Sequence, residues 1–114
     1  MYNDAELLRT QRAFLFEVEQ GIRVANREII HAHIPEITRE SVFELAVVVA
    51  RLRASYLEAA FELARTPQGE PPEARLIAEL RIRRETYEES REAFSALQRA
   101  IEVGYVDLSK IPAK

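Results

Sequence analysis

The sequence contains no cysteine and no tryptophan, only three glycines, and no long apolar run. Without cysteine the chain has no disulfides, no thiolate metal ligands and no cysteine nucleophile. Three scattered glycines exclude a glycine-rich phosphate-binding loop, because such loops need several glycines close together. The longest apolar run, over 45–50, is much shorter than the ~20 residues of a membrane-spanning helix. The N-terminal residues lack the basic segment and apolar core of a secretory signal, so we expect a cytoplasmic protein.

The charge balance excludes a second group of functions. Formal net charge is −3, with 47% hydrophobic and 31% charged residues. A weakly acidic chain has no general attraction for nucleic acid or for anionic membranes, so we expect neither as a partner. With 114 residues, the chain is long enough to bury one core, and we expect a single helical domain over 1–114.

The hydrophobic periodicity predicts three helices, over about 4–31, 39–65 and 73–103. The connection over 66–72 carries three prolines and a glycine, which are typical loop residues. So short a connection implies that the second and third helices are antiparallel neighbours. The sequence therefore predicts an all-α fold, an antiparallel three-helix bundle.

Residues at the ends of these helices support the same boundaries. Asn3 is suited to cap the first helix, with Glu6 three residues on, and Thr38 is suited to cap the second. Gly104 follows the third helix and is expected to end it in the left-handed conformation, which glycine adopts most easily.

The first helix carries an apolar seam typical of helices that pack against another helix. Apolar residues recur at alternating three- and four-residue spacing, with one glutamine in the gap. Gly21, in the middle of the helix, marks either a bend or a close contact with a neighbouring helix. The seam consists of Leu8, Gln11, Leu15, Val18, Ile22, Ala25 and Ile29.

The second helix is apolar around most of its circumference, which indicates neighbours on at least two sides. Its polar residues form one narrow strip: Glu44, Arg51, Ser55, Glu58, Glu62 and Arg65. Arg53 lies almost opposite that strip, and we expect it to be buried or at an interface. The residues expected beside it in a core or a subunit interface are Val48, Val49, Leu52 and Tyr56. A buried arginine is unfavourable unless it is paired, so we favour a carboxylate from another helix as its partner. The alternatives are a side chain that extends to the solvent and one that binds an anionic ligand in a pocket.

The middle of the third helix, over 81–92, is a run of arginine and glutamate with few apolar residues. The favoured interpretation is a solvated face crossed by ion pairs such as Arg81 with Glu85 and Arg84 with Glu88. A charged docking surface is the alternative. Nucleic-acid binding is disfavoured, because the glutamates cancel most of the positive field.

Few residues are suited to catalysis or to metal binding, and the main candidate pair is Glu28 with His31. Glu28 and His31 have the Glu-x-x-His spacing that supplies half of the metal site in ferritin-like di-iron bundles. One copy per chain would require an inter-subunit site for iron or another divalent metal, whose candidate ligands are Glu28, His31, Glu58 and Glu62. We favour a different role, in which His31 and His33 lie at a helix C-terminus, where a partly positive imidazole is stabilised. We therefore predict no metal or other cofactor.

The residues after Gly104 are too apolar for a free terminus, and we expect 105–108 to dock on the bundle or on a second subunit. Binding of another protein through the tail over 105–111 is the alternative. The favoured function is non-enzymatic: a small homo-oligomeric helical protein, dimeric or larger, that acts as an assembly, adaptor or regulatory subunit. The alternatives are a ferritin-like metal-binding half-bundle and a helical subunit of a larger complex.

Overall fold

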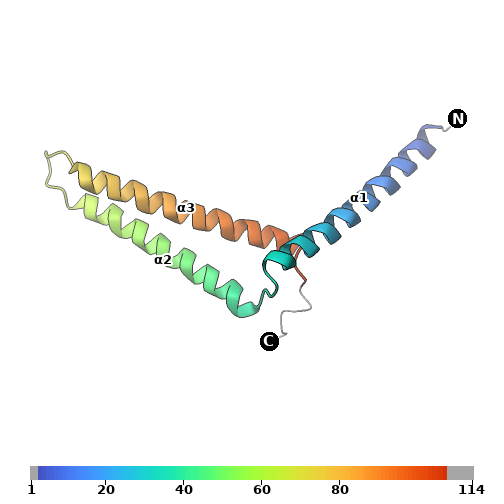
Figure 1. The fold of residues 1–114 in the computed structure, drawn as a ribbon. Coiled ribbons are helices and arrows are strands. Elements are labelled where there is room, and N and C mark those ends of the chain that lie inside the picture. Colours follow the sequence, from blue (N-terminus) through green and yellow to red (C-terminus); the bar gives the residue numbers. More distant parts are fainter. Residues whose placement is uncertain (1–2, 108–114) are drawn as a thin grey trace. The chain divides into compact units, whose positions relative to one another are not determined.

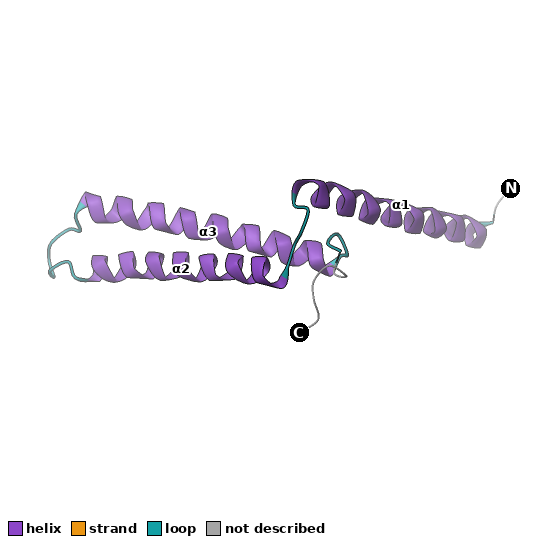
Figure 2. Cartoon of the chain, turned by 60° about the horizontal axis from the view of Figure 1, so that its bottom comes forward, coloured by secondary structure: helices purple, strands orange, loops and turns teal. Residues whose placement is uncertain are grey.

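The computed structural model describes residues 3–107 and consists of three α-helices. Helix α1 spans Asp4–His33, α2 spans Arg39–Ala64 and α3 spans Ala74–Glu102. The described residues form no β-strand (Figure 2). The all-α class is confirmed, and each helix boundary lies within about two residues of the predicted one, the usual uncertainty of a helix end.

The predicted N-caps are present at the first two helices. The backbone N–H of Glu6 donates to the Asn3 side-chain oxygen at 2.8 Å. Thr38 and Ser41 form a reciprocal capping box, in which each side-chain oxygen accepts the backbone N–H of the other residue at 3.1 and 2.9 Å. These bonds satisfy amide groups that a helix start leaves without partners, which fixes where α1 and α2 begin.

Along residues 3–107, none of the helices combines the length and the apolar character that crossing a membrane requires.

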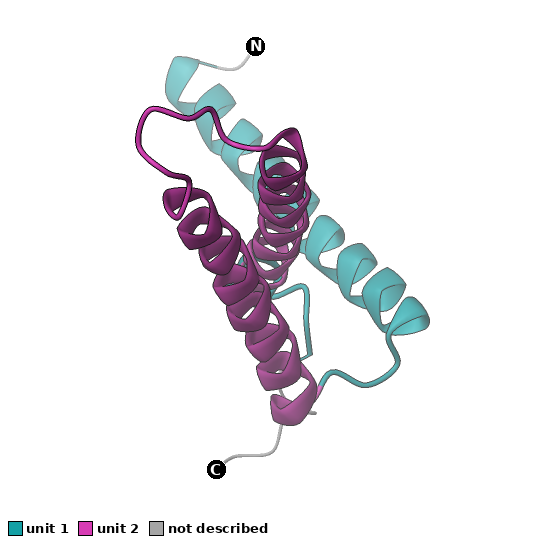
Figure 3. Ribbon diagram, turned by 90° about the vertical axis from the view of Figure 1, so that its left-hand side faces the viewer, with its two compact units in different colours: residues 1–37, 99–114 teal, residues 38–98 magenta. Residues whose placement is uncertain are grey.

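The chain divides into two compact units (Figure 3). One consists of 1–37 and 99–114, and the other of 38–98. Helix α3 contributes residues to both units. The single domain predicted from the sequence and the closed three-helix bundle stay predictions.

The unit over 38–98 is an antiparallel helical hairpin, with α2 and α3 side by side (Figure 1). Val49 and Ala59 of α2 are its buried residues. Tyr56 of α2 stacks on Tyr87 of α3, with ring centroids 5.9 Å apart. The antiparallel pairing of these two helices, predicted from the short loop between them, is confirmed.

The other unit joins α1 to the end of α3. Gly104 has a φ of +81° and ends the helix in the left-handed conformation, as predicted. Its N–H donates to Ile101 O at 3.1 Å and the N–H of Tyr105 donates to Ala100 O at 2.8 Å. This pair of bonds is the Schellman motif. Val106, directly after it, is only 3% exposed.

Candidate functional site

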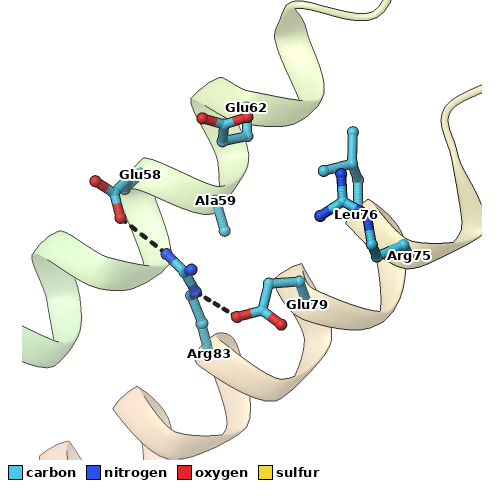
Figure 4. A pocket seen from close by; sticks show the side chains of 7 residues that line it. All are labelled: Glu58, Ala59, Glu62, Arg75, Leu76, Glu79 and Arg83. Carbon is cyan, nitrogen blue, oxygen red and sulfur yellow. Dashed lines mark hydrogen bonds and ion pairs between the residues drawn. The ribbon is translucent and has the colours of Figure 1, made fainter.

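Arg83 is the main polar connection between α2 and α3 (Figure 4). Its guanidinium donates to Glu79 on its own helix and to Glu58 on α2, both at 2.9 Å, and to the Ser55 carbonyl at 3.2 Å. The hydrogen bonds to Glu79 and then to Glu58 raise the pKa of Arg83. The surrounding hollow is lined by Glu58, Ala59, Glu62, Arg75, Leu76, Glu79 and Arg83.

This arrangement fastens the hairpin. One guanidinium bridges two carboxylates and one backbone carbonyl, so its donors are directed at groups of the same unit. Sequence reasoning had treated the charged run over 81–92 as ion pairs within one helix. Arg81 with Glu85 at 2.9 Å and Arg84 with Glu88 at 3.9 Å follow that pattern, whereas Arg83 also reaches across to α2.

Arg53 is exposed rather than buried, and its partner is a phenol rather than the expected carboxylate. Its Nε donates to the Tyr87 hydroxyl at 3.2 Å, and its guanidinium carbon lies 5.3 Å from the centre of the same ring. Arg91 lies over that ring at 5.7 Å. Arg53 is exposed because it lies at the margin of the face that packs on α3. From there its long side chain reaches both the Tyr87 ring and water.

The residues predicted to share a core or interface with Arg53 differ in exposure. Val49 is buried, and Leu52 and Tyr56 are half-buried on the same side of α2. Val48 is 41% exposed. The interface with a second copy that this set was predicted to form stays a prediction.

A second apolar face of α2 is exposed, and we call it the α2 stripe. Phe43 and Phe61 are 69% and 70% exposed, and Leu57 is half exposed. Ala50 and Ala54, between them, are exposed as well. Successive members alternate between four- and three-residue spacing, the signal by which the sequence marks this face. The α2 stripe consists of Phe43, Val47, Ala50, Ala54, Leu57 and Phe61.

The seam predicted on α1, which we call the α1 seam, is exposed too. Leu15 and Ile29 are 58% and 59% exposed, and Leu8 and Ile22 are about half exposed. None of the residues of α1 is buried. Nothing lies within 4 Å of the side chain that a larger residue would have at Gly21, and α1 continues through that position. The described residues therefore make no close contact at Gly21.

The opposite face of α1 holds the end of α3 in what we call the clasp. Arg27 donates to the Gly104 carbonyl through Nη2 at 3.0 Å and Nε at 3.3 Å. Arg23 donates to the Val103 carbonyl at 3.2 Å. Two positive side chains thus meet carbonyls at the negative end of a helix, a favourable arrangement. Sequence reasoning missed the clasp, whose signal is basic residues at four-residue spacing on the face opposite the seam.

His31 completes the clasp and is engaged at both ring nitrogens. The backbone N–H of Asp107 donates to Nε2 at 3.0 Å. An accepting Nε2 assigns the proton to Nδ1, which lies 3.3 Å from the Ile34 carbonyl. His31 lies in the last turn of α1, as predicted, but a ring with an accepting Nε2 is neutral rather than partly positive. The tail residues up to Asp107 dock on α1 in the same way, while 108–111 lie outside the described residues.

The other candidate metal ligands come from α1 and α2. Glu28 is exposed on α1, Glu58 is bonded to Arg83, and Glu62 is paired with Arg65 at 3.0 Å. Within the part of the chain that the structure describes, no three histidine, aspartate or glutamate side chains gather as metal ligands.

Comparison with known proteins finds no family model, no curated protein and no solved structure that matches this chain.

Proposed function

We propose that this protein is a non-enzymatic, self-assembling helical protein, an assembly, adaptor or regulatory subunit whose compact helical bundle is completed by dimerisation. The observation that carries this proposal is the second apolar face of α2. Phe43 and Phe61 are 69% and 70% exposed although α2 already packs another face on α3. Apolar faces rimmed by polar residues typically mark protein–protein contacts.

Burial of this face is a source of free energy for holding two chains together. A phenylalanine side chain taken from water into an apolar contact contributes about 1.5–3 kcal/mol. A symmetric dimer contains two stripes, so each stripe residue contributes once from each chain. Four such side chains in a dimer give a gain of the same order as the translational, rotational and side-chain entropy that association costs.

The polar groups of the hairpin support a structural role. Arg83 is bonded to both Glu58 and Glu79, and Arg53 and Arg91 face the ring of Tyr87. Groups engaged in this way hold α2 against α3. The hairpin can then present its exposed apolar face on a rigid frame.

The proposal is tested by the mass of the protein in solution. We expect light scattering to give about 26 kDa or more at micromolar concentration, twice the 13.1 kDa of one chain or a higher multiple. The double variant Phe43→Glu/Phe61→Glu should be monomeric, because it places charge within the apolar face. Ser95→Glu, an exposed position of α3, is the matched control and should leave the mass unchanged. A wild-type mass of one chain at high concentration would contradict the proposal.

A further inference from the structure

The α1 seam and the α2 stripe have matching patterns. Both alternate three- and four-residue steps, and both are exposed over most of their length. A helix with such a seam packs best against another helix with the same spacing, because side chains of one then fit the gaps of the other.

We propose that α1 of one copy docks antiparallel on the α2 stripe of a second copy, with Leu15 opposite Leu57. The inference rests on the proposed function and identifies the surfaces and the register by which copies assemble. Two such contacts form in a symmetric dimer, because each chain contributes one α1 and one α2. The register places these residues opposite one another: Gln11 and Phe61, Val18 and Ala54, Ile22 and Ala50, Ala25 and Val47, Ile29 and Phe43.

The sizes of the facing residues are complementary. Ile22 meets Ala50 and Val18 meets Ala54, so a branched side chain faces a small one in the middle of the contact and the helices can approach closely. Gly21 is brought beside Arg53 of the second copy, whose bulk occupies the open space at that glycine. The close contact indicated by a glycine in mid-helix is thereby accounted for.

The charges beside the seam select this register. Arg12 of α1 lies beside Glu58 of the second copy, and Glu19 lies beside Arg51. Glu58 also bonds Arg83, but its side chain is 72% exposed and a carboxylate has a second oxygen to offer. Opposite charges beside the apolar contact of two helices favour their pairing and set its register.

The neighbouring registers are unfavourable for the same reason. A shift of α1 by one heptad in one direction places Arg12 beside Arg51 and Glu19 beside Glu44. A shift in the other direction places Glu19 beside Glu58. Of these three registers, only the proposed one has both flanking pairs of opposite sign. The other two are disfavoured because like charges across a helix pair are destabilising.

The clasp favours docking of α1 on the α2 stripe of a second copy over docking on α2 of the same chain. If α1 docked on its own α2 in this register, Arg27 would lie level with Leu45. Counted from the Arg53–Tyr87 pair, Leu45 is level with Ser95 of α3. That is about nine residues, or ~13 Å along a helix, short of Gly104, whose carbonyl Arg27 holds. Docking on a second copy keeps the clasp, because Arg23 and Arg27 lie on the face of α1 opposite the seam.

Disulfide cross-linking tests the docking directly, since the chain has no cysteine of its own. A tagged Leu15→Cys chain is mixed with an untagged Leu57→Cys chain, allowed to exchange subunits and oxidised. We expect a disulfide-linked pair containing one tagged and one untagged chain. The matched control replaces Leu15→Cys by Leu8→Cys, which lies one heptad or ~10 Å away along α1 and should give at least ten-fold less of the mixed product.

The double variant Leu15→Cys/Leu57→Cys identifies the occupant of the stripe. A linked dimer supports the proposal, whereas a disulfide within one chain shows that α1 docks on its own α2 and overturns it. A tagged Leu15→Cys pair linked to itself would show that two α1 helices pair instead, and also overturns it. Light scattering on the same samples separates the two proposals: a dimer without the mixed cross-link contradicts only this docking, and a monomer contradicts the proposed function as well.

Discussion

Gly104 has two separate reasons to be glycine. Its φ of +81° is unfavourable for any residue with a side chain, and a Cβ there would lie 3.1 Å from the side chain of Arg23. Gly69, in the loop between α2 and α3, has a similar φ of +87° but nothing within 4 Å of a Cβ. The two glycines therefore share the backbone requirement and differ only in the neighbouring arginine.

Comparison of Gly104→Ala with Gly69→Ala separates the two effects. Both substitutions should lower the free energy of unfolding by about 1–2 kcal/mol, the usual penalty for a left-handed residue. Gly104→Ala should show a further loss, because Arg23 must move away from the Val103 carbonyl. Urea denaturation measures both values. Equal losses in the two variants would contradict a close contact between Arg23 and Gly104.

The structure also perturbs the protonation of Tyr87. The hydrogen bond from Arg53 lowers the pKa of the Tyr87 hydroxyl below its ordinary value, because a guanidinium stabilises the phenolate. The unfolded chain keeps the ordinary value of about 10, so it binds this proton more tightly than the folded chain does. Wild-type stability relative to Tyr87→Phe should therefore rise as pH increases through the folded pKa, and this gain is lost as pH falls again.

The measurement is a phenolate absorbance titration combined with urea denaturation at several alkaline pH values. Arg53→Met removes the donor and is expected to move the pKa of Tyr87 upward while leaving the Tyr56 ring in place. An unchanged titration in Arg53→Met would show that the hydroxyl of Tyr87 does not accept that hydrogen bond.

At the scale of elements, α2 is the unusual helix, because it presents one apolar face to α3 and another to solvent. The sequence shows that α2 needs neighbours on two sides, since apolar periodicity and the single polar strip are properties of the chain alone. It does not show which face meets which partner. Arg53 illustrates the limit: a carboxylate is its expected partner on grounds of charge, yet the register of the hairpin brings Tyr87 beside it.

The flanking charges allow a prediction about the pairing of α1 with α2. Glu19→Arg should weaken the dimer several-fold, because it places two arginines side by side across the contact, and exposed ion pairs of this kind contribute about 0.2–1 kcal/mol each. Adding Arg51→Glu in the same chain reverses the pair and should restore the affinity. The dissociation constant is measured by dilution at low salt, where screening is weak.

Arg51→Glu alone serves as the matched control and should weaken the dimer as Glu19→Arg does. Additive losses in the double variant would contradict the proposed neighbours, because residues that do not interact show no coupling in a double-mutant cycle.

At the scale of the whole molecule, each unit is stabilised by its own kind of contact. The kind of contact determines which features could be predicted from the sequence. The helix boundaries and caps follow from local patterns at Asn3, Thr38 and Gly104, which a sequence displays directly. The clasp joins the side chains of Arg23 and Arg27 to backbone carbonyls. Every residue has a carbonyl, so no sequence pattern marks those acceptors. Exposed apolar faces are intermediate between the caps and the clasp. The sequence shows the spacing of their residues but not which partner covers them.

The clasp also implies an order of folding. Contacts that fasten the hairpin join residues 25 to 34 positions apart, as in Arg83 with Glu58 and Arg53 with Tyr87. Contacts of the clasp join residues 76 to 80 positions apart and involve the last described part of the chain. Closure of so long a loop is entropically more demanding, and during synthesis it must wait for residues 103–107, which are made after the hairpin. The hairpin is therefore complete before α1 meets the end of α3, and α1 is the last of the three helices to be held in place although it is made before the other two.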